Sequence, residues 1–188
     1  MVSDSHSHSV YQVSISNNGA FLQGTVSLVI KLPERANPLG LAFDGRNVYV
    51  ANSNSDGGII KFNLATSGSS IIVRNCTPNC HIVHGVDVST DGNIVFTDRG
   101  SRLVWSLSPR TLEIQVIAGS GANSSRDGSS LAVSFCQPTA LCIEGKTMFV
   151  ADTAVGAIKV VTPTNSLCKF PELLDSLCRM FGAHLRGV

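Results

Sequence analysis

Hydrophobic positions in this chain fall into a short pattern that occurs three times, over residues 40–52, 85–98 and 140–152. Each copy is a short apolar run, a tight turn with Gly, and a second apolar run that ends in a small polar pair. Repeats spaced by roughly 45 to 55 residues are typical of propellers and solenoids. The pattern therefore predicts a repeat architecture.

Each copy predicts a set of short antiparallel strands. The first apolar run is too short for a helix and meets a turn such as Asp44-Gly45, where Gly supplies the positive φ that a hairpin needs. The second run, for example Val48-Tyr-Val50, is rich in β-branched and aromatic residues that favour strands. Third strands are predicted in all copies and fourth strands in two, at residues 58–62, 103–107, 157–161, 70–73 and 114–117.

Four antiparallel strands make one propeller blade. The predicted blades cover residues 39–74, 85–118 and 140–162, and residues 26–32 indicate the outer strand of a further blade whose earlier strands are weak or missing. Because propellers close with four to eight blades, the chain is expected to need self-association or a longer parent chain to complete its ring.

The last copy carries a family resemblance. Val116-Ile-Ala-Gly-Ser-Gly121, Asp127-Gly128, Phe149-Val-Ala-Asp-Thr153 and Ile158-Lys-Val-Val161 resemble the linker and strand signature of the NHL-repeat family. Weaker copies extend the resemblance to residues 25–162. It implies an all-β propeller that uses one loop face for protein or RNA ligands. In these repeats a basic residue usually precedes the third strand, and only the middle copy keeps one, Arg102.

The two ends differ from the repeats. Residues 1–24 are assigned to an N-terminal tail with weak strands, and residues 1–9, which are polar, are expected to be disordered. Residues 25–165 form the propeller repeats, and 166–188 a C-terminal tail. Apolar residues at helical spacing between 171 and 184 predict a short amphipathic helix there, too short and too charged to span a bilayer.

Composition narrows the function classes. The chain has 188 residues, of which 43% are hydrophobic and 14% charged, and this length is enough to bury one core. Its net charge of +1 produces no global field that would attract nucleic acid or acidic lipid. No signal peptide or membrane anchor is recognised, which favours the cytoplasm. No cofactor and no membrane partner are predicted.

Cys76, Cys80, His81 and His84 offer thiolate and imidazole, the ligands that zinc prefers. Structural zinc sites usually separate two ligand pairs by a dozen residues or so, whereas these four lie together between two repeats. An unligated loop is therefore favoured over a metal site or a loop disulfide.

A catalytic site is not predicted. None of the five histidines is placed on an inner strand, and no nucleophile elbow, phosphate loop or zinc-protease motif is present. The chain is therefore predicted not to be an enzyme, with a divergent propeller lyase or hydrolase as a distant alternative.

Binding remains as the main function class. The loops after the second strands are predicted to share one face, with candidate contacts at Asn52, Asp98, Arg99, Arg102 and Asp152. Aspartates at strand ends commonly cap the following loop, so a structural role is the favoured alternative for Asp98 and Asp152. The predicted function is a noncatalytic interaction module for protein or peptide partners, with RNA binding as the alternative.

Overall fold

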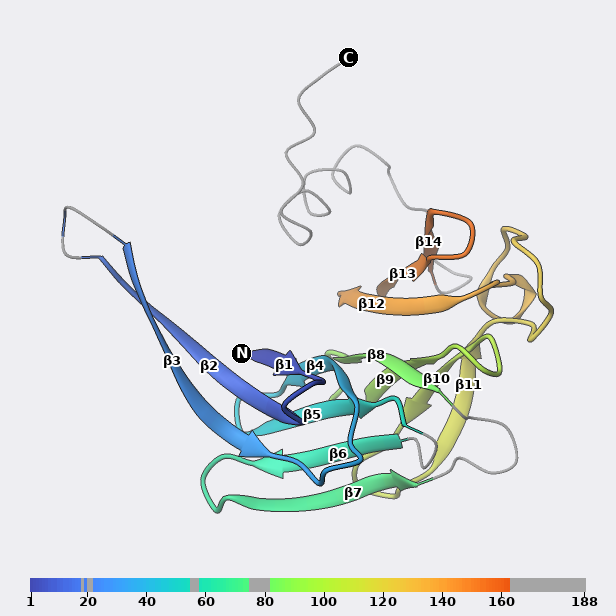
Figure 1. Ribbon diagram of the computed structural model, residues 1–188. Coiled ribbons are helices and arrows are strands. Elements are labelled where there is room, and N and C mark those ends of the chain that lie inside the picture. The colour runs from blue at the N-terminus through green and yellow to red at the C-terminus, as the bar shows by residue number, and fades with distance from the viewer. Residues whose placement is uncertain (18, 20–21, 55–57, 75–81, 163–188) are drawn as a thin grey trace.

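The described part of the chain folds into four antiparallel sheets that follow one another along the sequence (Figure 1). The computed structural model describes residues 1–17, 19, 22–54, 58–74 and 82–162. The first sheet contains β1 (Val2–Asp4), β2 (Ser9–Asn17) and β3 (Leu22–Lys31), and the second contains β4 (Pro38–Phe43), β5 (Asn47–Asn52), β6 (Gly58–Asn63) and β7 (Gly68–Arg74).

The third sheet contains β8 (Val83–Val88), β9 (Ile94–Asp98), β10 (Leu103–Leu107) and β11 (Ile114–Ala118). The fourth contains β12 (Pro138–Glu144), β13 (Thr147–Asp152) and β14 (Ala157–Val161), and a single 3-10 turn (Ser130–Ala132) lies in the linker before it. These sheets confirm the predicted all-β fold of four-stranded antiparallel blades. The predicted C-terminal helix and residues 75–81 lie outside the described residues.

The second, third and fourth sheets repeat one register. The first residue of the inner strand pairs with the last residue of the second strand, and the pairing then shifts before it resumes three residues on. In the third sheet, for example, Val83 pairs with Asp98 and Val86 with Phe96. Such an irregularity bends a strand locally, and here it recurs at the same place in each blade.

Apolar side chains fill the spaces between neighbouring sheets. In β9, Phe96 packs toward the second sheet beside Tyr49, whereas Val95 packs toward the fourth beside Val150. All five β9 residues are buried. Because successive side chains of a strand point to opposite faces, a strand covered on both faces is apolar at consecutive positions, as Ile94–Phe96 of β9 are.

The prediction of disorder over residues 1–9 was wrong. Val2–Asp4 pairs with β2, the hydroxyl of Ser3 donates to Leu39 O at 2.6 Å, and His8 Nδ1 donates to Ala36 O at 2.5 Å. Val10 is fully buried against the second sheet. The segment is ordered by contacts with residues 36 and 28 positions further along the chain. A short polar stretch gives no local signal of such contacts.

Close packing of the inner strands depends on two glycines. A Cβ on Gly40 would lie 2.6 Å from His84 O, and one on Gly85 would lie 2.8 Å from Leu141 N. Backbone atoms cannot yield as a flexible side chain does, so these positions set how closely β4, β8 and β12 approach one another.

Replacing Gly85 with Ala is expected to destabilise the fold by about 2 kcal/mol or more, because the methyl group must push β8 away from β12. Urea unfolding followed by circular dichroism measures the change. Gly24→Ala is the matched control, since nothing lies within 4 Å of a Cβ at that position. Equal stability of the two variants would contradict the tight approach of the inner strands.

Candidate binding face at the loop end of the propeller

The candidate face is held in place by a side chain at the end of each second strand. Asn52 Oδ1 accepts a hydrogen bond from Asn37 N at 2.8 Å, and Asp98 Oδ1 accepts one from Ile82 N at 2.9 Å. In the fourth sheet, Asp152 Oδ1 accepts one from Gln137 N at 2.6 Å. Each bond joins the end of a second strand to the residue just before the inner strand of the same sheet.

A second hydrogen bond accompanies each of these contacts, and we call each pair of bonds a clamp. The backbone amide that follows each clamp residue donates to the carbonyl of the same partner residue, at 2.9, 3.0 and 3.1 Å in the second, third and fourth sheets. The carboxylate of Asp98 also accepts from Gly100 N and Ser101 N, and that of Asp152 from Cys136 N. Backbone amides that lack a strand partner are thereby satisfied.

Three of the predicted contact residues therefore point inward. Asn52 is 8% exposed, and Asp98 and Asp152 are fully buried. Their acceptor oxygens bond backbone amides next to their own sheets, and Asn52 Nδ2 donates to Asn54 Oδ1. This arrangement agrees with the structural alternative for the two aspartates.

Arg99 and Arg102 lie in the β9–β10 loop, directly after the clamp of the third sheet. Arg99 is exposed and Arg102 is half-buried. Arg102 adopts a left-handed φ of 61° and its amide donates to Asp98 O at 2.9 Å. Trp105 in β10 donates from Nε1 to Ser101 Oγ at 3.3 Å, and this bond connects the loop to the strand that follows it.

Two further arginines lie at the same end of the molecule. Arg35 is exposed in the β3–β4 linker, and its carbonyl accepts a bond from Asn54 Nδ2 at 2.8 Å. Arg126 is exposed in the β11–β12 linker, and its amide donates to Ser134 Oγ at 2.8 Å. Both linkers enter inner strands at the end where the second strands finish. We call Arg35, Arg99, Arg102 and Arg126 the arginine face.

His84 lies on the inner strand β8, which corrects the expectation that no histidine occupies such a strand. It lines a cavity of about 360 Å³ formed by the inner strands, together with Leu39 and Thr139, which occupy the same position in β4 and β12. Burial lowers the pKa of His84, and the nearby charge of Arg99 lowers it further, while Asp98 acts in the opposite direction.

Cys76, Cys80 and His81 lie outside the described residues, so the structure brings only His84 of that group into view. Within the described residues, no three His, Cys, Asp or Glu side chains come together as a metal site would require. In the same part of the chain, no helix has the length and hydrophobicity needed to cross a membrane.

Comparisons with solved structures define the class of the fold. The chain is similar to virginiamycin B lyase from Staphylococcus aureus, with a TM-score of 0.52 and 10% identity over 87% of this chain and 51% of the lyase. An auxiliary nutrient binding protein from Bacteroides thetaiotaomicron gives 0.54 and 13% over 72% and 40%. A second protein from that organism, of unknown function, gives 0.53 and 16% over 81% and 44%.

These similarities show a β-propeller segment that spans about half or less of the length of those proteins. At such identities they show the fold alone. No family model matches the sequence, and no curated protein matches it.

The prediction that the chain is not an enzyme was wrong. The same fold serves a lyase, so the architecture does not exclude catalysis. The exclusion had also relied on the absence of an inner-strand histidine, and His84 is one.

Replacing Asp152 with Ala is expected to cost about 2–4 kcal/mol of unfolding free energy, because the amides of Cys136 and Gln137 lose their acceptor. Asp152→Asn is the matched control and should retain most of the stability, since Asn52 performs the same role in the second sheet. Urea unfolding at neutral pH distinguishes the variants, and an unchanged Asp152→Ala protein would disprove the clamp.

Stability should also fall as pH decreases through 6.5. The pKa of His84 lies below the ordinary value of 6.5 in the folded protein, so the unfolded state binds more protons in this range and is favoured by acid. His84→Thr, which copies Thr139, should reduce the loss of stability between pH 7.5 and 5.5. His6→Thr, in the exposed β1–β2 loop, controls for removal of an imidazole, and equal losses in both variants would refute the assignment.

Proposed function

We propose that this chain is an NHL-like propeller segment that binds an acidic protein or peptide partner at the arginine face. The observation that carries the proposal is the placement of Arg35, Arg99, Arg102 and Arg126 at one end of the sheets. Guanidinium groups form paired hydrogen bonds with carboxylates, which favours acidic ligands. The sequence resemblance to NHL repeats implies ligand binding at one loop face, which supports a contact at this end of the propeller.

The acidic residues near this face are largely engaged within the protein. Asp98 and Asp152 are buried in the clamps. Asp127 accepts a bond from Lys159 Nζ at 2.6 Å, but its side chain is 93% exposed and offsets the charge of the adjacent Arg126. Glu34 is exposed next to Arg35 and offsets its charge. Arg99 and Arg102 therefore form the centre of the proposed contact.

A protein partner is favoured over RNA by the position of the aromatic side chains. Tyr49, Phe96 and Phe149 are at most 2% exposed, so none of the three offers a ring for base stacking. Sequence-tolerant binding of single-stranded nucleic acid usually combines a basic groove with such stacking. The face therefore offers guanidinium groups, including those of Arg35 and Arg126, without a ring from these three residues. Binding of carboxylates matches this chemistry better than binding of bases does.

The double variant Arg99→Gln, Arg102→Gln is expected to weaken binding of a fluorescein-labelled glutamate-rich peptide by roughly tenfold, because two charge-assisted contacts are lost. Fluorescence anisotropy at low ionic strength measures the affinity, which should fall as salt is added. Arg46→Gln, Arg110→Gln is the matched control, since both arginines are exposed in turns at the opposite end of the sheets.

Equal affinity of the two double variants for the peptide would overturn the proposal. The same titration with single-stranded oligouridine tests the alternative partner. Tighter binding of the oligonucleotide than of the peptide, lost in the Arg99 and Arg102 variant alone, would replace the protein partner with RNA.

A further inference from the structure

The hydrogen bonds of β1 match those of a second strand in a blade. Ser3 Oγ donates to Leu39 O in the next inner strand, as Thr97 Oγ1 donates to Thr139 O. Asp4 accepts from His6 N and Ser7 N at 2.9 and 3.3 Å, as Asp98 accepts from the loop amides that follow it. Two independent contacts therefore assign Val2, Ser3 and Asp4 to the positions of Phe96, Thr97 and Asp98.

The inner strand of this first sheet is missing from the described residues. The second strands β5, β9 and β13 each pair with an inner strand on one side and a third strand on the other. In contrast, β1 pairs with β2 alone, and the sheet order is β1-β2-β3. The edge of β1 that would carry an inner strand is thus unpaired within the described chain.

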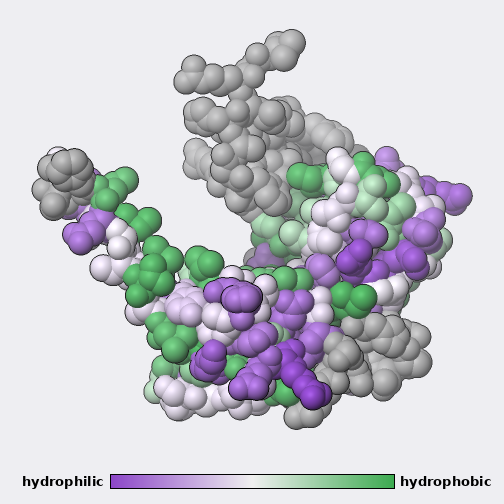
Figure 2. Space-filling model, viewed as in Figure 1, coloured by the Kyte–Doolittle hydropathy of each residue, from purple (hydrophilic) through white to green (hydrophobic). Residues whose placement is uncertain are grey.

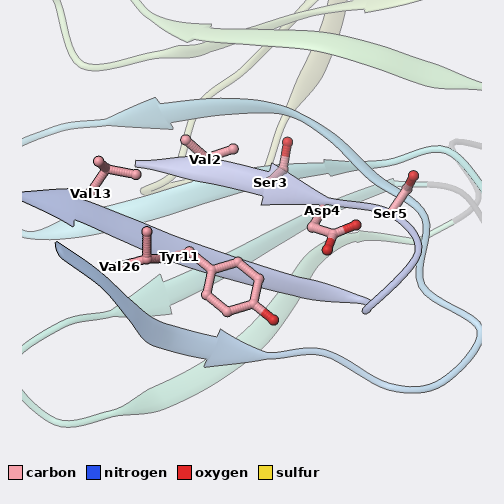
Figure 3. A pocket seen from close by; sticks show the side chains of 7 residues that line it. All are labelled: Val2, Ser3, Asp4, Ser5, Tyr11, Val13 and Val26. Carbon is pink, nitrogen blue, oxygen red and sulfur yellow. The ribbon is translucent and has the colours of Figure 1, made fainter. Parts of the chain in front are cut away.

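Side chains at this edge are exposed where their counterparts are buried. Val2 is 52% exposed, whereas Phe96 is fully buried, and Asp4 is half-buried, whereas Asp98 is fully buried. Figure 3 shows Val2, Tyr11, Val13 and Val26 around one hollow, whose volume is about 560 Å³. An unpaired strand edge beside an apolar hollow is suited to strand addition.

We propose that β1 is a docking site for an extended segment of another polypeptide, which adds to the first sheet as its inner strand. The register follows from the other three sheets. The first residue of the segment pairs with Asp4 and the fourth with Val2, as Val83 and Val86 pair with Asp98 and Phe96. The carboxylate of Asp4 accepts the backbone amide of the residue before the segment, as Asp98 accepts that of Ile82.

The segment must also satisfy the packing of the inner strands. Its third residue would lie against β4, in the position where a Cβ on Gly40 or Gly85 meets the backbone of the next strand. Glycine is therefore expected there, between an apolar first and an apolar fourth residue. This pattern of apolar, any residue, glycine and apolar defines the partner by its chemistry.

The chain's own inner strands do not supply the segment. β4, β8 and β12 are each paired within their own sheets, and a second copy of the chain would use its own strands in the same way. The contacts of this proposal involve neither Arg99 nor Arg102, so the proposal does not depend on the proposed function.

An N-acetylated, fluorescently labelled peptide with the sequence of residues 82–88 is the probe, because it carries the pattern with Gly85 in the third position. It should bind the full chain saturably and protect the backbone amides of β1 from hydrogen exchange. Asp4→Ala should weaken binding by about tenfold, since a hydrogen bond to a charged acceptor is lost. Asp4→Asn should bind within about threefold of the unchanged chain, as Asn52 retains the same contact.

Two matched pairs distinguish the docking site from general adhesion. A peptide with Val in place of the Gly should bind at least tenfold more weakly, because its side chain meets the backbone of β4. Val2→Asp should abolish binding, whereas Leu22→Asp, at a residue 75% exposed on the β2–β3 hairpin, should not change it. Absence of saturable binding, equal binding of the two peptides, or equal effects of the two Asp substitutions would each overturn the proposal.

Discussion

The architecture depends on a buried acceptor at the end of each second strand. A chain that turns sharply into and out of an inner strand leaves backbone amides without sheet partners, and an unpaired buried amide costs about as much as a lost hydrogen bond. Asn52, Asp98 and Asp152 supply the missing acceptors. The loops that carry Arg99 and Arg102 take their positions from these contacts, so the candidate face is a consequence of the clamp.

The sequence predicted the repeats well because burial on both faces leaves a strong apolar signal. Val48-Tyr-Val50, Ile94-Val-Phe96 and the turns before them were placed correctly, since each strand packs against two neighbouring sheets. β1 was missed because its order comes from Leu39 and Ala36, far along the chain. Local polarity cannot report such contacts.

His84 was missed for a different reason. The apolar run of the second repeat begins at Val86, and the register shift between Val83 and Val86 extends the strand backward through residues that break the apolar pattern. Arg35 and Arg126 were overlooked because linkers have no periodicity, and only the topology brings them to the same end as the β9–β10 loop. Sequence patterns thus located the strands but not the side chains that the loops and linkers present together.

An open arc of sheets leaves an apolar face wherever a neighbouring blade is absent. On the β2–β3 hairpin, Tyr11 pairs with Leu28 and Val13 with Val26, and alternate residues of paired strands share one face. The space-filling view shows hydrophobic residues along this hairpin (Figure 2), and Ile15, Val26 and Leu28 are all more than half exposed. In the second and third sheets the corresponding faces are covered by adjacent blades. The same alternation that fills the interior of the arc therefore leaves one face of its first sheet apolar and exposed.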